Sequence, residues 1–391
     1  MQTHTPKKTY LGALIMAWMF LFGMIGTALV GPNRLSIERE FGLSHETFGA
    51  TFALIQILCS VIVLVVAVRL THIDSLNALI VSLLIQMVGF VTVYFTSSVW
   101  LLMLGWMLVT FGIVIGSVCN TISADLWTNN PARGVTLLHG FNGIGKTIGP
   151  LIAAYCLLLG WRLSFLVVAA ITGLIFVAFV FHKRHHVSPS PPDHSFQVRV
   201  LTSSMYWLCI LPFGLIAGGD VAFATLVPLY YETVHGYTAQ NASLLLMVHF
   251  VGLTLGRFIF SYLSGPLSNN AIIGLCLAFG LGIVPAVHSN LLSLHIIGLL
   301  GVGVLYSSTW ATFYTQAARL IPAHARHLLD FGTALGNAIG IAFCVYISSA
   351  LADHNLHLAM YFCVFALYLF GLVYYLSPLS TSNVHPVSTG T

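Results

Sequence analysis

Long apolar runs separated by short polar breaks extend over nearly the whole chain. A helix needs roughly 20 apolar residues to cross the hydrocarbon core of a bilayer, and the pattern predicts twelve such helices. They are expected at residues 10–31, 47–68, 76–96, 99–122, 137–158, 162–181, 204–230, 240–263, 270–288, 291–315, 328–350 and 358–377. The sequence therefore predicts an all-α membrane protein.

Composition agrees that lipid is the solvent of this chain. The 391 residues are 58% hydrophobic and 6% charged, and the mean hydropathy is +0.94, outside the range of soluble globular proteins. A net charge of +4 does not indicate a nucleic-acid partner, because Lys and Arg occur singly between apolar runs and form no basic patch. The expected partners are the lipid bilayer and a small-molecule solute.

The distribution of cations predicts how the chain crosses the membrane. With the N-terminus inside, the inner segments hold nine Lys and Arg residues, and the outer segments hold only Arg34, Arg39 and Arg162. This positive-inside bias places both termini in the cytoplasm. Short loops and the lack of a targeting sequence favour a multi-pass protein of a bacterial inner (plasma) membrane.

The middle of the chain holds the one extended polar segment, which is rich in proline and histidine. The predicted organisation is an N-terminal six-helix bundle at 1–181, a cytoplasmic linker at 182–200, a C-terminal six-helix bundle at 201–378 and a cytoplasmic tail at 379–391. An offset of 191 residues lays Gly145 on Gly336 and Gly149 on Gly340, in the fifth span of each half. This shared register predicts that the halves arose by duplication.

Local motifs agree with this arrangement. They are a glycine-proline motif at 145–150, the segment Gly160-Trp161-Arg162 that opens the sixth span, and Gly256-Arg257 followed by a Gly265-Pro266 turn. With these motifs and six plus six helices, the chain resembles the major facilitator superfamily over nearly its whole length. The loop signature between spans two and three is reduced to residues 68–74, and the fourth span lacks the basic residue of proton-driven drug antiporters, so no subfamily follows.

The resemblance implies two six-helix bundles related by a pseudo-two-fold axis. The bundles would enclose a central cavity, lined mainly by the first, fourth, seventh and tenth spans, and would rock to open it to either side in turn. It also implies a monomer.

Charges inside the apolar runs are functional candidates, because burying one costs about 2.5–3.5 kcal/mol on insertion scales. Lys146 lies near the middle of the fifth span and suits an anionic group such as a carboxylate, or else a structural ion pair. Asp220 follows two glycines that could loosen the seventh helix. It could take up and release a proton, or be a structural partner of Lys146 or Arg257.

The remaining charged candidates lie toward predicted helix ends. Arg257 is expected to brace helices on the cytoplasmic side, as the resemblance implies. Asp125 and Asp330 could pair with Arg133 or another inner arginine in a gate, although Asp330 would also be favoured by the helix dipole alone.

The tenth span is far more polar than a lipid-facing helix requires. Tyr306, Trp310 and Tyr314 recur every four residues among hydroxyl side chains, which suits contact with an organic solute, or equally hydrogen bonding between helices. His249 is a second proton-coupling candidate because it is intramembrane, with an interhelical hydrogen bond as the alternative. Polar candidates for the same lining are Asn120, Asn142, Asn337 and Gln56.

These features predict a secondary transporter for a small polar or anionic organic solute, such as an organic acid, an amino-acid-like compound or a carboxylate-type siderophore. Efflux of amphipathic drugs or metabolites is one alternative, and a membrane receptor is a non-transport alternative. No nucleophile elbow, HExxH or P-loop occurs, so an enzyme is not expected. No cofactor is predicted, and the loop histidines lack the cysteine or carboxylate partners of a metal site.

Overall fold

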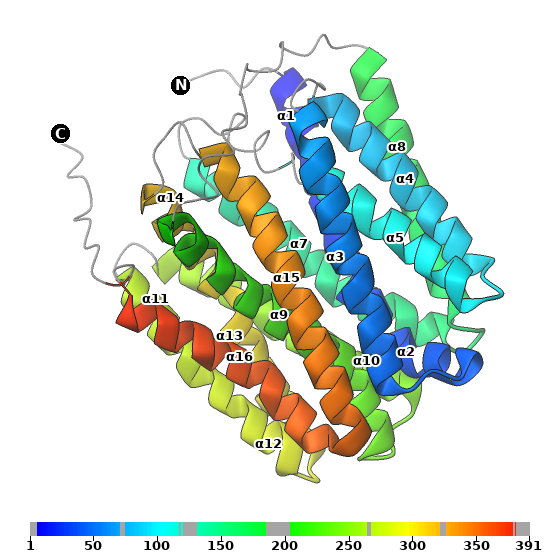
Figure 1. Cartoon of the computed structure of the whole chain (residues 1–391), viewed down its shortest axis with the longest axis vertical. Coiled ribbons are helices and arrows are strands. Elements are labelled where there is room, and N and C mark those ends of the chain that lie inside the picture. The colour runs from blue at the N-terminus through cyan, green and yellow to red at the C-terminus, as the bar shows by residue number, and fades with distance from the viewer. Residues whose placement is uncertain are drawn as a thin grey trace.

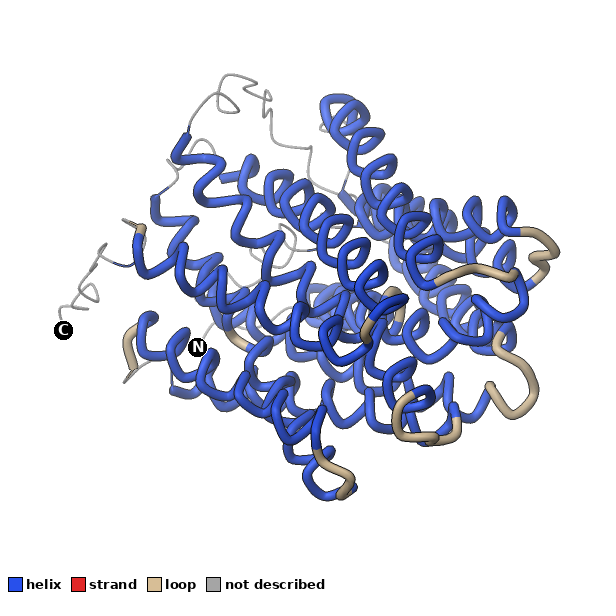
Figure 2. The backbone as a smooth tube through the Cα atoms, turned by 60° about the horizontal axis from the view of Figure 1, so that its bottom comes forward, coloured by secondary structure: helices blue, strands red, loops and turns tan. Residues whose placement is uncertain are grey.

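The computed structural model describes residues 6–70, 75–116, 119, 131–184, 204–263, 267–320, 326–377 and 380, with only the backbone described at several helix ends. Every regular element in these residues is a helix (Figure 2). The first half contains α1 (Pro6–Met24), α2 (Thr27–Phe41), α3 (His45–Leu70), α4 (Ser75–Tyr94), α5 (Val99–Ile115), α7 (Pro131–Cys156) and α8 (Arg162–Arg184). The second half contains α9 (Ser204–Thr233), α10 (Ala239–Leu263), α11 (Asn269–Phe279), η3 (Gly280–Gly282), α12 (Ile283–His288), α13 (Leu292–Ser307), α14 (Thr309–Leu320), α15 (Arg326–His354) and α16 (Leu356–Leu376).

The helices form the predicted all-α membrane fold. Ten segments of the described chain are long and apolar enough to span a bilayer. α5 is a shorter apolar helix and α7 is a further long helix, so each of the twelve predicted spans is helical where the chain is described. The two halves lie next to each other as separate groups of helices (Figure 1). We call the end of the bundle that carries the α2–α3 and α15–α16 turns the far end; it lies opposite the start of α1 and the end of α16.

Equivalent helices pack through equivalent glycines in the two halves. In the first half α7 packs on α1, where a Cβ on Gly145 would overlap the carbonyl oxygen of Phe20. In the second half α15 packs on α9, where a Cβ on Gly336 would lie 2.5 Å from the carbonyl oxygen of Ile210. The same register therefore serves the same packing role twice. Between the halves, α3 packs against α15 and α7 against α10.

Three of the predicted spans are divided: the first and tenth by helix breaks, and the ninth by the 3-10 turn η3 between α11 and α12. The first span was expected to end near residue 31, but it continues to Phe41 after a break at Ile25 and Gly26. This places Arg34, which we had counted among the outer loop cations, fully buried inside α2. The tenth span breaks at Ser308, between α13 and α14.

The seventh span is a continuous helix, although its glycines were expected to loosen it. Its glycines do not loosen the helix, because α9 is continuous from Ser204 to Thr233. Gly218 is instead required for close packing, since a Cβ there would overlap the backbone of Gly340 on α15. Small residues let membrane helices approach closely, and Gly218 lets α9 approach α15 in this way.

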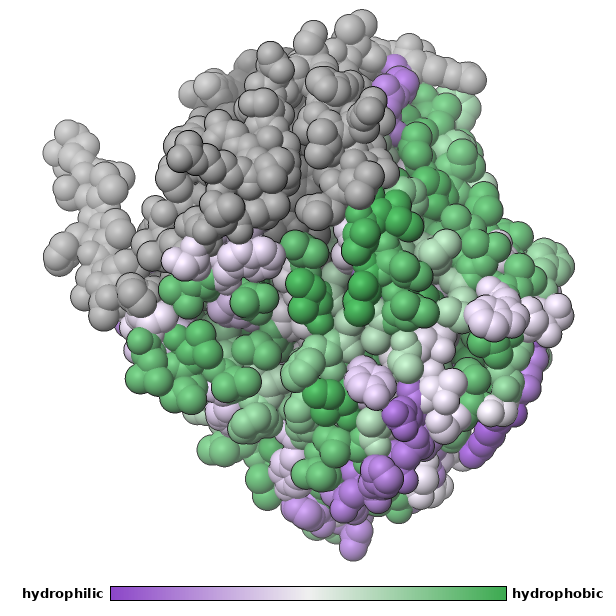
Figure 3. Space-filling view, in the orientation of Figure 1, coloured by the Kyte–Doolittle hydropathy of each residue, from purple (hydrophilic) through white to green (hydrophobic). Residues whose placement is uncertain are grey.

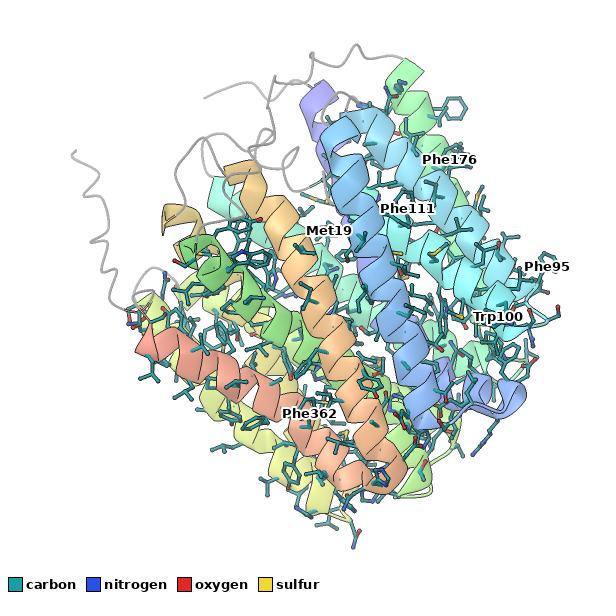
Figure 4. All side chains as sticks on the ribbon, in the orientation of Figure 1. Met19, Phe95, Trp100, Phe111, Phe176 and Phe362 are labelled. Carbon is teal, nitrogen blue, oxygen red and sulfur yellow. The ribbon has the colours of Figure 1, made fainter. Side chains whose placement is uncertain are left out.

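The outer surface matches a lipid environment. Apolar side chains cover most of the described surface in Figure 3, and hydrophilic ones gather toward the far end. Phe95 and Trp100 project from the α4–α5 turn with 69% and 79% of their surface exposed (Figure 4). Aromatic side chains at this height are typical of the membrane–water interface.

Candidate functional site

A cavity of about 320 Å³ lies between the two halves. Its walls come from the first span (Trp18 to Val30), from α5, from α9 and from both pieces of the tenth span, as expected for the central cavity, with further residues from α3, α7 and α15. Met19, labelled in Figure 4, is one of the lining residues near the middle of the bundle.

An ion pair crosses this cavity from one half to the other. The Lys146 ammonium on α7 donates a hydrogen bond to Oδ2 of Asp220 on α9. The second carboxylate oxygen of Asp220 lies 3.4 Å from Nε2 of His249 on α10, and His249 is completely buried. The Lys146 ammonium also lies over the Phe250 ring, with Nζ 5.3 Å from the ring centroid. Lys146, Asp220 and His249 therefore form one connected group.

Arg257 ties together three helices beside that group. Its Nη1 donates to the carbonyl oxygen of His139 at 2.7 Å and to Oδ1 of Asn142 at 3.2 Å, both on α7. Its Nε donates to the carbonyl oxygen of Ser307 at 3.3 Å, where α13 ends. The guanidinium thus satisfies a carbonyl group at the break in the tenth span, and its bracing role stays a prediction.

The aromatic stripe of the tenth span is divided between two environments. Trp310 lines the cavity and stacks on Tyr314 with ring centroids 5.2 Å apart, while the His139 ring lies 5.0 Å away on the other half. Tyr306 also lines the cavity, but its hydroxyl is bonded to the carbonyl oxygen of Cys363. Trp310 is therefore the residue of this stripe whose ring contacts the other half.

Contacts at the far end also join the halves. Arg34 donates from Nη2 to Ser349 Oγ on α15 at 3.2 Å and from Nε to Glu38 Oε1 at 2.7 Å. Asp353 at the end of α15 accepts hydrogen bonds from the first two backbone N–H groups of α3. These contacts hold α2 and α3 against α15 beyond the cavity.

The first span is interrupted at the level of the cavity. Gly26 adopts φ 64° and ψ −129°, a conformation that favours glycine, and α2 begins at the next residue. Ile25, Gly26 and Thr27 all line the cavity. The N-terminus of α2 has no side-chain cap, so backbone N–H groups at that end lack the usual partner.

Sequence comparison identifies the family. A model of the Major Facilitator Superfamily matches residues 14–336. The chain belongs to the Major Facilitator Superfamily. A relative from Bacillus subtilis (strain 168), described as the uncharacterized MFS-type transporter YcnB, is 27% identical over 237 residues. That match covers 56% of this chain and 44% of the relative, so the chain matches less than half of the relative's length.

Solved structures of other superfamily transporters share the fold. A bacterial homologue of the human lysosomal transporter Spinster, in an inward-facing and unoccupied conformation, gives a TM-score of 0.70 at 15% identity and covers 95% of this chain and 97% of its own. The nucleoside transporter NupG gives 0.67 at 10% identity, covering 98% and 100%. The Escherichia coli fucose:proton symporter FucP gives 0.62 at 14% identity, covering 94% and 98%.

Several predicted site residues line the cavity between the two halves. The structure brings together eight of them as lining residues, namely Lys146, Asp220, Arg257, Asn142, Asn337, Gln56, Tyr306 and Trp310. Tyr314 stacks on Trp310, and His249 contacts the carboxylate of Asp220. Asn120 and Asp125 lie outside the described residues, and Arg133 and Asp330 lie on α7 and α15 where only the backbone is described.

Sequence reasoning missed the far-end contacts of Arg34 and Asp353 and the position of Thr27 on the cavity wall. Arg34 and Glu38 are spaced four residues apart, as helix ion pairs are, and that spacing was a usable sign that the helix continues. Asp353 carried no comparable signal, because its partners are backbone groups about 308 residues away in sequence.

Proposed function

We propose that this chain is a secondary transporter for a small anionic organic solute, with Lys146 as the main counter-charge. The observation that supports it is the charge of the cavity. Among the described lining residues, Lys146 and Arg257 are cationic and Asp220 is the single carboxylate. One positive charge is left over, which favours an anion over a cation or a neutral sugar.

The arrangement suits exchange of partners during transport. A solute carboxylate that approaches Lys146 competes with Asp220 for the same ammonium. An unpaired carboxylate in a low-dielectric interior is costly, and protonation removes its charge. Asp220, in contact with His249, is thus the proposed site of proton coupling, and Asn142 and Asn337 are proposed to bind polar groups of the solute.

The proposed orientation follows the cation distribution, with both termini in the cytoplasm of a bacterial cell and the far end outside. The contacts of Arg34 and Asp353 then hold the outer side closed. Alternating access would require these contacts to break while the cytoplasmic side closes. We propose that a monomer carries out this cycle.

Ligand-induced thermal stabilisation of the purified chain tests the proposal. A ligand that binds the folded state at about 100 times its Kd stabilises it by about 2.7 kcal/mol. The panel contains organic acids, amino acids, sugars and lipophilic cations. We expect an organic acid to raise Tm, and the double variant Lys146→Met/Asp220→Asn to lose this response.

The double variant removes one positive and one negative charge together, so the net charge of the cavity is unchanged, and it avoids the uncompensated carboxylate that Lys146→Met alone would leave. Lys183→Met is the matched control, because Lys183 is an exposed lysine that bonds to Asn77 outside the cavity. An organic acid that still stabilises the double variant would contradict the role of Lys146.

Efflux of amphipathic compounds is the second candidate function. It is favoured by the aromatic walls of the cavity, which include Trp18, Phe52 and Trp106. Stabilisation by lipophilic cations alone, dependent on Asp220, would favour efflux and rule out the anion site.

A further inference from the structure

The break in the first span places the uncapped N-terminus of α2 at the cavity wall. The backbone N–H groups of Leu29 and Val30 both bond to the carbonyl oxygen of Gly26, so the first turn of α2 is formed, but its N-terminus has no side-chain cap. The N-terminus of a helix carries partial positive charge and unpaired N–H groups, which together attract anions. α2 has 15 residues, long enough to present such an end.

This helix end lies at the same height as Lys146. A Cβ on Gly23 of α1 would lie 2.9 Å from the backbone nitrogen of Lys146. On the other side of the break, a Cβ on Gly149 of α7 would lie 2.6 Å from the Cβ of Ala28. These two contacts on α7 are only three residues apart, so the turn from Lys146 to Gly149 packs directly beside the break.

Two polar side chains at this place lack the partners that buried groups normally have. Thr27, the first residue of α2, is 6% exposed and lines the cavity, and its hydroxyl makes no hydrogen bond within the described part of the chain. Asn142 is 4% exposed, and its Nδ2 has no partner among the described residues. Buried polar groups are nearly always hydrogen-bonded, so the Asn142 amide points to a missing ligand, and the Thr27 hydroxyl offers a further donor at the cavity wall. Both can donate.

The cavity wall beside the break is aromatic. Trp18 and Phe22 come from α1, Phe52 from α3, Trp106 from α5 and Phe165 from α8, all in the first half. Trp18 stacks on Phe22 with ring centroids 5.7 Å apart, and Trp106 contacts Phe52 edge to face at 6.1 Å. These side chains offer a rigid apolar surface that suits a flat organic group.

We propose that the break in the first span is the docking point for the carboxylate head of a monocarboxylate with an aromatic body. The head lies between the N-terminus of α2, the Thr27 hydroxyl and the Lys146 ammonium, and the body rests against Trp18 and Trp106. This inference rests on the proposed function and adds to it the class of anion and the group that binds its head. A compact single charge fits the one positive charge in excess.

Equilibrium binding of phenylacetate to the purified full-length chain tests the inference. Tryptophan fluorescence reports on the body, and calorimetry confirms the affinity independently. Acetate carries the head without the aromatic body, and phenylacetamide carries the body without the charge. We expect phenylacetate to bind at least about tenfold more tightly than either of them.

Thr27→Val removes the hydroxyl at nearly constant shape and should weaken phenylacetate binding about tenfold, the effect of one hydrogen bond to a charged group. Thr27→Ser retains the hydroxyl and should restore binding to within about twofold of the parent chain. Thr172→Val is the control for a buried threonine away from the cavity, where the hydroxyl bonds only to the carbonyl oxygen of Val168 on its own helix. It should bind as the parent does.

Each outcome has a distinct meaning. Should Thr27→Val bind phenylacetate as the parent does while Lys146→Met/Asp220→Asn does not bind it, the head is held elsewhere, and only the proposed function survives. Equal affinity for acetate and phenylacetate overturns the aromatic body. Absence of carboxylate binding at millimolar concentration overturns both this inference and the anion site.

Discussion

Asp353 joins the two halves by capping a helix that belongs to the other half. Its Oδ1 accepts a hydrogen bond from the backbone nitrogen of His45 at 3.1 Å, and its Oδ2 accepts one from Glu46 at 2.8 Å. The first N–H groups of a helix have no partner within the helix, so a carboxylate there stabilises it. This contact exists only while α3 and α15 are together, and it therefore favours the closed far end.

We predict that Asp353→Ala shifts the protein toward an open far end. Loss of a helix cap costs about 0.5–2 kcal/mol, and a charge at an exposed helix end contributes about 0.3–1 kcal/mol. The two effects overlap here, and Asp353 is exposed, so we take about 1 kcal/mol in total. That corresponds to about a fivefold increase in the ratio of open to closed molecules. Asp353→Asn retains an acceptor oxygen and should give a smaller shift.

Spin labels on Ala50→Cys and His354→Cys measure the separation of α3 and α15 in the purified chain. Both positions are exposed, and all seven native cysteines are buried. Gly49→Leu shows whether the assay detects opening, because a Cβ at Gly49 would already overlap the side chain of Ser349. An unchanged distance distribution in Asp353→Ala, with a longer distance in Gly49→Leu, would falsify the capping argument.

Three further predictions follow from local geometry and can be checked by thermal unfolding. Gly26→Ala should lower stability by about 1–3 kcal/mol because of its positive φ, whereas Gly173→Ala, where a Cβ would make only an ordinary contact with Met87 Sδ at 3.5 Å, should leave Tm unchanged or higher. Gly340→Leu should prevent folding, since any side chain there overlaps the backbone of Gly214; recovery of a folded monodisperse protein would contradict this packing. Burial and two nearby histidines lower the pKa of His235, so the unfolded chain binds a proton more readily and stability should fall as pH drops below about 6.5; His235→Gln should flatten that loss.

Hydropathy predicted the number and position of the helices because it measures transfer from water to lipid, and that free energy dominates in this chain. The same measure could not predict the breaks at Gly26 and Ser308. Both lie inside continuous apolar runs, and a break depends on backbone dihedral angles and on the neighbouring helices rather than on hydrophobicity. The Gly218-Gly219 pair shows the converse, since packing against α15 keeps a glycine-rich segment helical.

The candidate site could be predicted only in part for the same reason. Intramembrane charges drew attention to Lys146, Asp220 and Arg257 because each needs a partner, but the sequence left open which partner each has. Lys146 and Asp220 are 74 residues apart, and only the packing of α7 against α10, which in turn packs against α9, settles their pairing. Thr27 carried no signal, because a threonine in an apolar helix is ordinary until the helix breaks beside it.

The far-end contacts and the Lys146–Asp220 ion pair, which both link the halves, have different sensitivities to a solute. The far-end contacts of Arg34 and Asp353 use groups of the protein alone, so an anion in the cavity leaves them intact. The link from Lys146 to Asp220 uses the same ammonium that the proposed solute would bind, so solute binding weakens it. A ligand shifts a conformational equilibrium only by its differential interaction with the two states. If the anion takes Lys146 from Asp220, it removes that link, and the far-end contacts together with the hydrogen bonds from Arg257 to α7 then set how readily the halves separate.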